Sequence, residues 1–210
     1  MNNEQELIQY RRAMYRLLSN IYINEVDEEM LQTLMGAEFP EVEDGIGWQQ
    51  NLKAGFEMLQ GVLAGFEGKT QAEKAEMLED LAADYAKTFL AAGDAAGKAA
   101  FPYESVYTGA DSQFGGSVQM QLNALYAANG LTMSKEMFPI MEDHIGLEMA
   151  FMAEILDKHD EAKAFFKEHL EKWAVRFAND IYKYSERDFY KGIARITIGF
   201  IDAETEYFKG

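Results

Sequence analysis

The sequence contains no cysteine, only three prolines and no long apolar run. Without cysteine the chain has no disulfide, no thiolate zinc site, no iron–sulfur ligand and no cysteine nucleophile. No window approaches the roughly 18 uninterrupted apolar residues of a membrane-spanning helix. The first residues also lack the basic region and apolar stretch of a secretory signal. These absences lead us to expect a cytoplasmic protein that is not inserted into a membrane.

Basic residues are scarce as well: 19 Lys and Arg stand against 36 Asp and Glu, so the formal net charge is −17. Proteins bind phosphate backbones and anionic membrane surfaces mainly by neutralising them with Lys and Arg. The charge therefore argues against a nucleic-acid partner and favours a cationic one, because opposite charges steer the encounter of two molecules.

Good helix formers dominate the chain, and no run of alternating β-branched residues predicts a strand. We expect an all-α fold: a single globular domain over residues 1–210 with about eight or more helices. Between Leu90 and Val118, five glycines and Pro102 interrupt the helical pattern, which predicts one long functional loop at about 91–117. The predicted helices cover about 4–23, a short segment capped by Asp27, 48–66, a segment from Thr70 to Phe89, 116–129, a segment from Pro139 to about 158, one after Asp160 that runs through Tyr184, and one capped by Ser185.

Catalytic motifs are missing. The sequence holds neither HExxH nor GxSxG, and the stretch around Gly65–Thr70 lacks the first glycine and the preceding strand of a phosphate loop. We therefore expect no catalytic residue and no cofactor. One metal-dependent alternative stays open, a helical hydrolase that uses Asp143, His144 and Glu148 as ligands.

Two polar clusters stand out from the helical pattern. The first lies in the long loop, where aromatic residues flank Glu104 and Ser105, and the second is Glu142-Asp143-His144. Aromatic faces beside a carboxylate can grip an arginine-bearing peptide through cation–π contacts and charge-assisted hydrogen bonds. The alternative is structural: a loop pinned by its aromatics and an ordinary acidic helix start.

Together these clusters resemble the TorD/DmsD family of cytoplasmic chaperones for molybdenum-cofactor oxidoreductases. The resemblance rests on four pieces in the family's order: Asp84-Tyr85-Ala86-Lys87-Thr88-Phe89-Leu90, Pro102-Tyr103-Glu104-Ser105-Val106-Tyr107, Asp143-His144 followed by Leu147–Met152, and the stretch from His169 to Tyr190. It implies an all-helical chaperone that binds the twin-arginine signal peptide and the apo form of such an enzyme and assists cofactor insertion before export.

The resemblance also implies which residues bind the peptide. Matched by position, they are Tyr85, Phe89, Pro102, Tyr103, Ser105, Asp143 and His144, to which we add Glu104 and Glu142 from the two polar clusters. We expect the 101–107 loop and the Asp143-His144 helix start to form one groove. In that groove Asp143 would attract arginine, and His144, with an ordinary pKa near 6.5, would make binding depend on pH.

Several alternatives stay open at this point. Besides the metal-dependent hydrolase, the protein could be an adaptor that binds another folded surface and no signal peptide. The sequence leaves open a monomer or a homodimer formed by domain exchange. It does not identify the client oxidoreductase, any nucleotide binding, or the carboxylates that would meet the arginines of the peptide.

Overall fold

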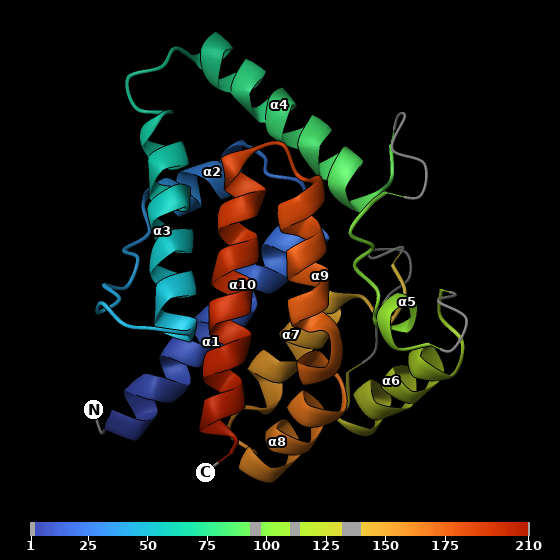
Figure 1. The fold of residues 1–210 in the computed structure, drawn as a ribbon. Coiled ribbons are helices and arrows are strands. Elements are labelled where there is room, and N and C mark those ends of the chain that lie inside the picture. Colours follow the sequence, from blue (N-terminus) through green and yellow to red (C-terminus); the bar gives the residue numbers. More distant parts are fainter. Residues whose placement is uncertain (1–2, 93–97, 110–113, 132–139, 210) are drawn as a thin grey trace. The chain divides into compact units, whose positions relative to one another are not determined.

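The computed structural model describes residues 3–92, 98–109, 114–131 and 140–209. These residues form α-helices, and their only β-type pairing is an isolated bridge between Tyr103 and His144, so the all-α prediction is confirmed. The helices are α1 (Asn3–Ile23), α2 (Glu28–Met35), α3 (Trp48–Ala64), α4 (Gln71–Phe89), α5 (Glu104–Thr108), α6 (Ser117–Ala128), α7 (Ile145–Ile155), α8 (His159–Glu168), α9 (Leu170–Tyr184) and α10 (Asp188–Tyr207) (Figure 1).

The chain divides into two compact units, each assembled from two separate stretches. The first unit combines Met1–Ile23 with Pro102–Ala174, and the second combines Asn24–Phe101 with Val175–Gly210. The chain passes from the first unit to the second within α9. Whether residues 1–210 form one domain stays a prediction.

In the first unit α1 packs along α7. The two helices approach closely at Gly146, where a Cβ atom would lie 3.0 Å from the carbonyl oxygen of Ser19. The Ser19 hydroxyl donates a hydrogen bond to the Gly146 carbonyl at 2.6 Å, and the Arg12 Nε donates to the Ala153 carbonyl at 3.0 Å. Backbone carbonyls of α7 thus gain donors from α1, which fixes the register of the pair.

In the second unit α3 and α10 run side by side (Figure 1). Glycine makes this contact possible, because a Cβ atom on Gly199 would lie 2.6 Å from the Trp48 carbonyl oxygen and one on Gly55 would lie 2.7 Å from the Ile196 nitrogen. The apolar stripe of α10 faces this contact: Phe189, Ile193, Ile196 and Phe200 are all buried, as their spacing predicts.

Three predicted helix boundaries are confirmed. The Asp27 side chain accepts a hydrogen bond from the Met30 amide and caps α2. Thr70 and Glu73 form a reciprocal capping box at the start of α4. The helix α6 ends at Ala128, before Asn129 and a Gly130 whose φ of 74° lies in the left-handed region that glycine tolerates.

Four sequence predictions of local structure are wrong. The predicted loop at 91–117 contains α5. The helix predicted from Pro139 begins only at Ile145, because His144 caps it; Pro139 itself lies outside the described residues. The segment after Asp160 is two helices that separate at His169. Finally, Arg187 and not Ser185 is the N-cap residue of α10.

Among the residues that the structure describes, no helix combines the length and the apolar character needed to cross a membrane.

Replacing Gly199 with alanine should reduce the free energy of unfolding by about 1–3 kcal/mol, because the added methyl group meets the backbone of α3. Gly61→Ala on α3 is the matched control, since a Cβ atom there meets nothing within 4 Å. The control should leave stability unchanged or raise it by up to about 1 kcal/mol. Urea titration monitored by circular dichroism measures both values, and equal effects of the two substitutions would contradict the close packing of α3 on α10.

Candidate functional site

The two polar clusters that the sequence singles out lie against each other in the first unit. The Glu104 amide donates to the Asp143 carbonyl at 2.9 Å, and the Ile145 amide donates to the Pro102 carbonyl at 2.9 Å. Together with the bridge between Tyr103 and His144, these bonds join the segment before α5 to the turn before α7. The expected convergence of residues 101–107 with the start of the Asp143-His144 helix is therefore present.

Asp143 is the central residue of this junction. One of its carboxylate oxygens, Oδ2, accepts hydrogen bonds from the Ser105 amide at 3.1 Å and from the Ser105 hydroxyl. The Ser105 oxygen in turn accepts a bond from the Gly115 amide at 2.8 Å. The Asp143 side chain is fully buried, and its other oxygen, Oδ1, has no hydrogen-bond partner among the described residues. The donors that the structure shows for the Asp143 carboxylate are thus the amide and the hydroxyl of Ser105.

Two further buried carboxyl groups lie in the same unit. A Glu104 carboxylate oxygen lies 2.7 Å from Nδ1 of His169, in the break between α8 and α9. Glu148 on α7 accepts a bond from the Trp173 indole nitrogen at 3.2 Å, while its Oε1 has no hydrogen-bond partner in the part of the chain that the structure describes. Burial, reinforced by the charges of Glu104 and Asp143, raises the pKa of Glu148 well above its usual value. This shift favours the neutral acid and relieves repulsion among the three groups.

Glu142 faces a different set of partners. Its carboxylate accepts a bond from the Gln119 amide nitrogen at 2.6 Å, and its backbone carbonyl accepts one from the Tyr126 hydroxyl at 3.1 Å. Burial, followed by the nearby carboxyl groups, raises the pKa of Tyr126 well above its ordinary value. Tyr126 therefore stays a hydrogen-bond donor and ties α6 to the turn before α7.

His144 differs from the sequence expectation. Its Nδ1 accepts a hydrogen bond from the Gly146 amide at 3.0 Å, so the imidazole is the N-cap side chain of α7. Burial lowers its pKa from 6.5 to about 3. The expectation of an ordinary pKa near 6.5 is therefore wrong, and His144 stays neutral between pH 5 and 8.

The accessible part of this junction is aromatic. Tyr103 is half-buried and packs edge-to-face on His144, with ring centroids 5.2 Å apart. On its other side Tyr103 meets Phe114 at 5.4 Å, and Phe114 is 51% exposed. We call Tyr103 and Phe114 the aromatic ledge. Tyr103 lies against the buried His144, and Phe114 is exposed to solvent.

Tyr85 and Phe89, the other two predicted peptide-binding residues, belong to the second unit. Their rings lie 4.9 Å apart on α4 and both contact Tyr190 on α10. Both side chains are buried in the core of that unit. Their role in peptide binding stays a prediction, as does that of the seven residues in the first unit.

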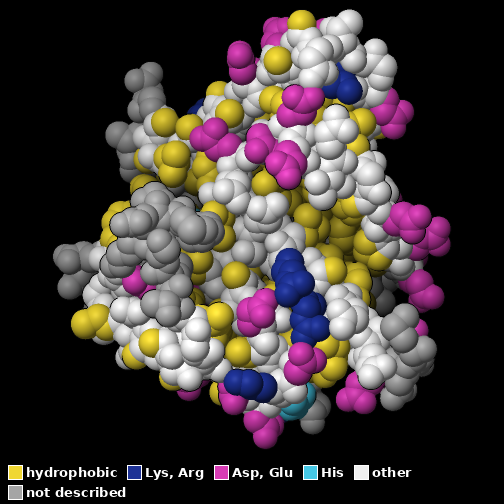
Figure 2. Space-filling model, turned by 180° about the vertical axis from the view of Figure 1, so that it is seen from behind, with side chains coloured by type: hydrophobic (Ala, Val, Ile, Leu, Met, Phe, Trp, Pro, Cys, Tyr) yellow, Lys and Arg dark blue, Asp and Glu magenta, His cyan; other side chains and the backbone are white. Residues whose placement is uncertain are grey.

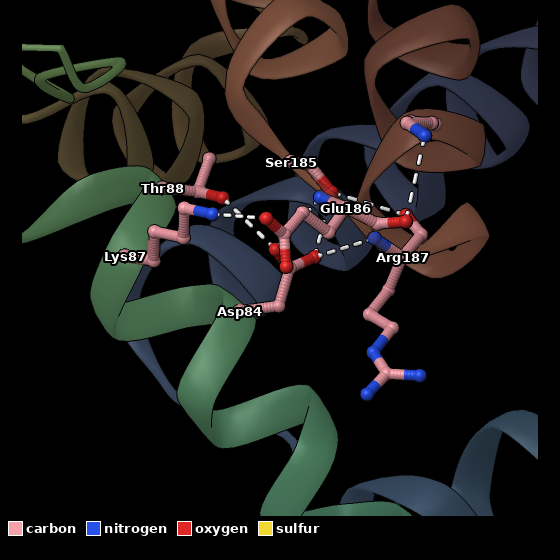
Figure 3. Close-up of polar contacts among 7 residues, drawn as sticks. Asp84, Lys87, Thr88, Ser185, Glu186 and Arg187 are labelled. Carbon is pink, nitrogen blue, oxygen red and sulfur yellow. Dashed lines mark hydrogen bonds and ion pairs between the residues drawn. The ribbon is translucent and has the colours of Figure 1, made fainter. Parts of the chain in front are cut away.

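Asp84, the first residue of the same sequence piece, has a structural role of its own. Figure 3 shows its carboxylate directed from α4 to the turn between α9 and α10. It accepts hydrogen bonds from the Glu186 amide at 2.8 Å and the Arg187 amide at 3.0 Å, and the Ser185 hydroxyl lies 2.6 Å away. Asp84 therefore holds the turn before α10 from another helix, and the Ser185 hydroxyl is one of its donors.

Sequence reasoning missed the roles of His169, Trp173 and Phe114 in this site. The apolar stripe Phe166, Leu170, Trp173 and Phe177 keeps helical spacing across the break at His169, so periodicity alone predicts one continuous helix. Glu104 and His169 lie far apart in the sequence, so no local sequence pattern predicts their contact.

The surface carries the negative charge that the composition predicts. On the face shown in Figure 2, Asp and Glu side chains are spread widely, whereas Lys and Arg side chains are few. In the described residues, no group of three or more His, Asp and Glu side chains is arranged to hold a metal ion. The proposed ligand set of Asp143, His144 and Glu148 is thus not supported, since His144 and Asp143 already bind backbone amides.

Comparison with known proteins identifies the class to which this fold and site belong. The family model described as "Nitrate reductase delta subunit" matches residues 48–179, more than half of the chain. The chain belongs to this family, the TorD/DmsD family that its motifs resemble.

Individual relatives agree over nearly the whole length. The chain is 27% identical to the chaperone protein TorD of Shewanella pealeana, over 96% of this chain and 90% of that protein. It is 29% identical to the chaperone protein TorD of Shewanella loihica, over 94% and 92%. A solved structure from Archaeoglobus fulgidus, assigned to redox enzyme maturation, has the same fold with a TM-score of 0.54 and 19% identity, over 91% of this chain and 93% of that one. These relatives are named as chaperones and not as catalysts, in agreement with the prediction that the protein is not an enzyme.

The depressed pKa of His144 predicts a pH-dependent stability. The unfolded chain takes up a proton on this imidazole near pH 6.5, whereas the folded chain does so only near pH 3. Stability is therefore fully present above pH 6.5 and falls as the pH drops toward 3, by at most about 1.4 kcal/mol per pH unit. In His144→Asn the cap is kept without a titrating group, so the slope of unfolding free energy between pH 7 and 5 should become shallower. Urea titrations at several pH values measure the slope, with the exposed His159→Asn as control; an unchanged slope in His144→Asn would contradict the assignment.

Removing the Asp84 carboxylate should reduce the free energy of unfolding by about 2–4 kcal/mol, because two backbone amides and the Ser185 hydroxyl lose their acceptor. The substitution is Asp84→Ala. Asp80→Ala is the control, since it only breaks a half-exposed ion pair with Arg187 and should cost less than about 1 kcal/mol. Thermal and urea unfolding report both, and similar losses would show that Asp84 is not the anchor of this turn.

Proposed function

We propose that this protein is a cytoplasmic chaperone that binds the twin-arginine signal peptide and the apo form of a molybdenum-cofactor oxidoreductase and assists cofactor insertion before export. The observation that carries the proposal is the family match, because residues 48–179 include every residue predicted to bind the peptide. The relatives named TorD support the chaperone role over nearly the full chain.

The charge of the protein supports a basic partner. A formal charge of −17 attracts a peptide with adjacent arginines and speeds its encounter with the chaperone. Apolar burial then has to hold the complex, since exposed ion pairs contribute little by themselves. A signal peptide that is basic at one end and apolar along its middle meets both requirements.

The aromatic ledge is the accessible part of the proposed binding region. Arginine stacks on tyrosine and phenylalanine faces by a cation–π interaction. Tyr103 and Phe114 offer such faces, while Asp143, Ser105 and His144 beneath them are occupied by hydrogen bonds within the chain. We therefore assign the direct arginine contact to the ledge, and to the buried residues the role of holding the ledge in position.

A synthetic twin-arginine signal peptide should bind the full chain, and replacing both arginines with glutamine should weaken binding, more at low salt than at high salt. Tyr103→Ala should lower affinity for the arginine peptide by about 1–3 kcal/mol. Tyr182→Ala on α9 is the control, because this tyrosine is also exposed, at 41%, but belongs to the other unit. Calorimetric titration gives the affinities.

Equal affinity for the two peptides at every salt concentration would refute the electrostatic part of the proposal. An absence of binding to any twin-arginine peptide would favour the adaptor alternative, in which the chain recognises a folded surface.

A further inference from the structure

The first unit contains a groove that is separate from the aromatic ledge residues. It has a volume of about 490 Å³ and lies between α6, α7 and α8. Its floor is made of the buried side chains Phe151, Ile155 and Phe165, with the partly buried Leu125 beside them. Pockets that bind small molecules or several peptide side chains have this size and this apolar lining.

Small residues keep the groove open. Ala128 at the end of α6 and Ala164 on α8 line it and are both exposed. A larger side chain at either position would fill space that is now accessible.

Its two ends differ in charge. At one end, beside the last residues of α6 and α7, the Lys158 ammonium binds the Asn129 side chain at 2.9 Å and Glu161 at 3.3 Å. At the other end, Glu168 is the last residue of α8 and has no ion-pair or hydrogen-bond partner among the described residues. A helix of ten residues is about 15 Å long, which is the separation that α8 gives the two ends.

The Glu168 end suits a cation because the Glu168 carboxyl group is exposed and has no ion-pair partner among the described residues. At the other end, Glu161 is paired with Lys158, so that end offers no unpaired carboxylate to a cation. An occupant with one basic end is therefore bound in a single direction.

We propose that this groove binds the apolar segment of the client signal peptide, with a basic side chain of that peptide beside Glu168. This inference rests on the proposed function, which it deepens by assigning the apolar part of the partner to a second contact surface. Apolar burial in the groove supplies the affinity, and the charge difference between its ends sets the direction of the peptide.

The absence of cysteine allows a direct test, because a single introduced cysteine is the only labelling site in the chain. Ala164→Cys carries an environment-sensitive dye inside the groove, and Lys167→Cys carries it on the exposed surface of the same helix outside the groove. A synthetic twin-arginine signal peptide should shift the emission of the dye at position 164 to the blue and leave the dye at position 167 unchanged.

A second probe separates this inference from the proposed function. It is a 14-residue peptide of leucine and alanine with one arginine at its end. If the twin-arginine peptide binds the unlabelled protein but does not change the dye at position 164, the groove inference is overturned and the proposed function stands. If only the leucine–alanine peptide binds and shifts that dye, the groove is supported and the proposed function fails. If neither peptide changes the dye at position 164, the groove inference is overturned.

Charge reversal tests the direction of binding. Glu168→Lys should weaken binding of the leucine–alanine–arginine peptide about tenfold, and should weaken a version with glutamine in place of arginine much less. Glu79→Lys on α4 is the matched control, because it changes the net charge equally and Glu79 is exposed. Equal losses in the two variants would overturn the pairing with Glu168 and assign the effect to net charge alone.

Discussion

The geometry of the candidate site depends on one buried carboxylate, that of Asp143. Its acceptor oxygen binds the Ser105 amide and hydroxyl, and the backbone around it pairs with the segment before α5. A carboxyl group that is removed from water needs such donors, because burying a polar group without hydrogen-bond partners is costly. The position of α5, and with it the position of Tyr103, therefore follows from the hydrogen bonds of a residue that no solvent reaches.

Glu104 and Glu148 are two further acidic side chains that the first unit buries. Glu104 meets the imidazole of His169, and Glu148 is driven towards its neutral form with the Trp173 indole as donor. These partners come from the break between α8 and α9 and from the first part of α9. The residue at the helix break, His169, is thus the one that contacts Glu104.

Much of the fold can be predicted from the sequence because its signals are local. Asp27, Thr70 with Glu73, and Asn129-Gly130 mark helix ends through hydrogen bonds and backbone angles within a few residues. The predictions fail where the local structure or the pKa depends on residues that are distant in sequence. The Ser185 hydroxyl binds Asp84 of α4 and does not cap α10. His144 is desolvated by the structure packed over it, so neither its capping role nor its pKa could be predicted from its neighbours in sequence. The juxtaposition of residues 101–107 with Asp143-His144 could be expected, but the burial of these polar residues could not.

The interleaved order of the two units has a consequence for synthesis on the ribosome. The first unit joins residues near the amino terminus to Pro102–Ala174, and the second is completed only by Val175–Gly210. At about 5–20 residues per second, α1 leaves the ribosome several seconds before α7, its packing partner, has been translated. During that interval the apolar side of α1 has no native surface to cover it, and α3 waits about as long for α10. Neither unit can therefore mature as a contiguous nascent fragment, and a chain truncated before α10 leaves the second unit without its central helix.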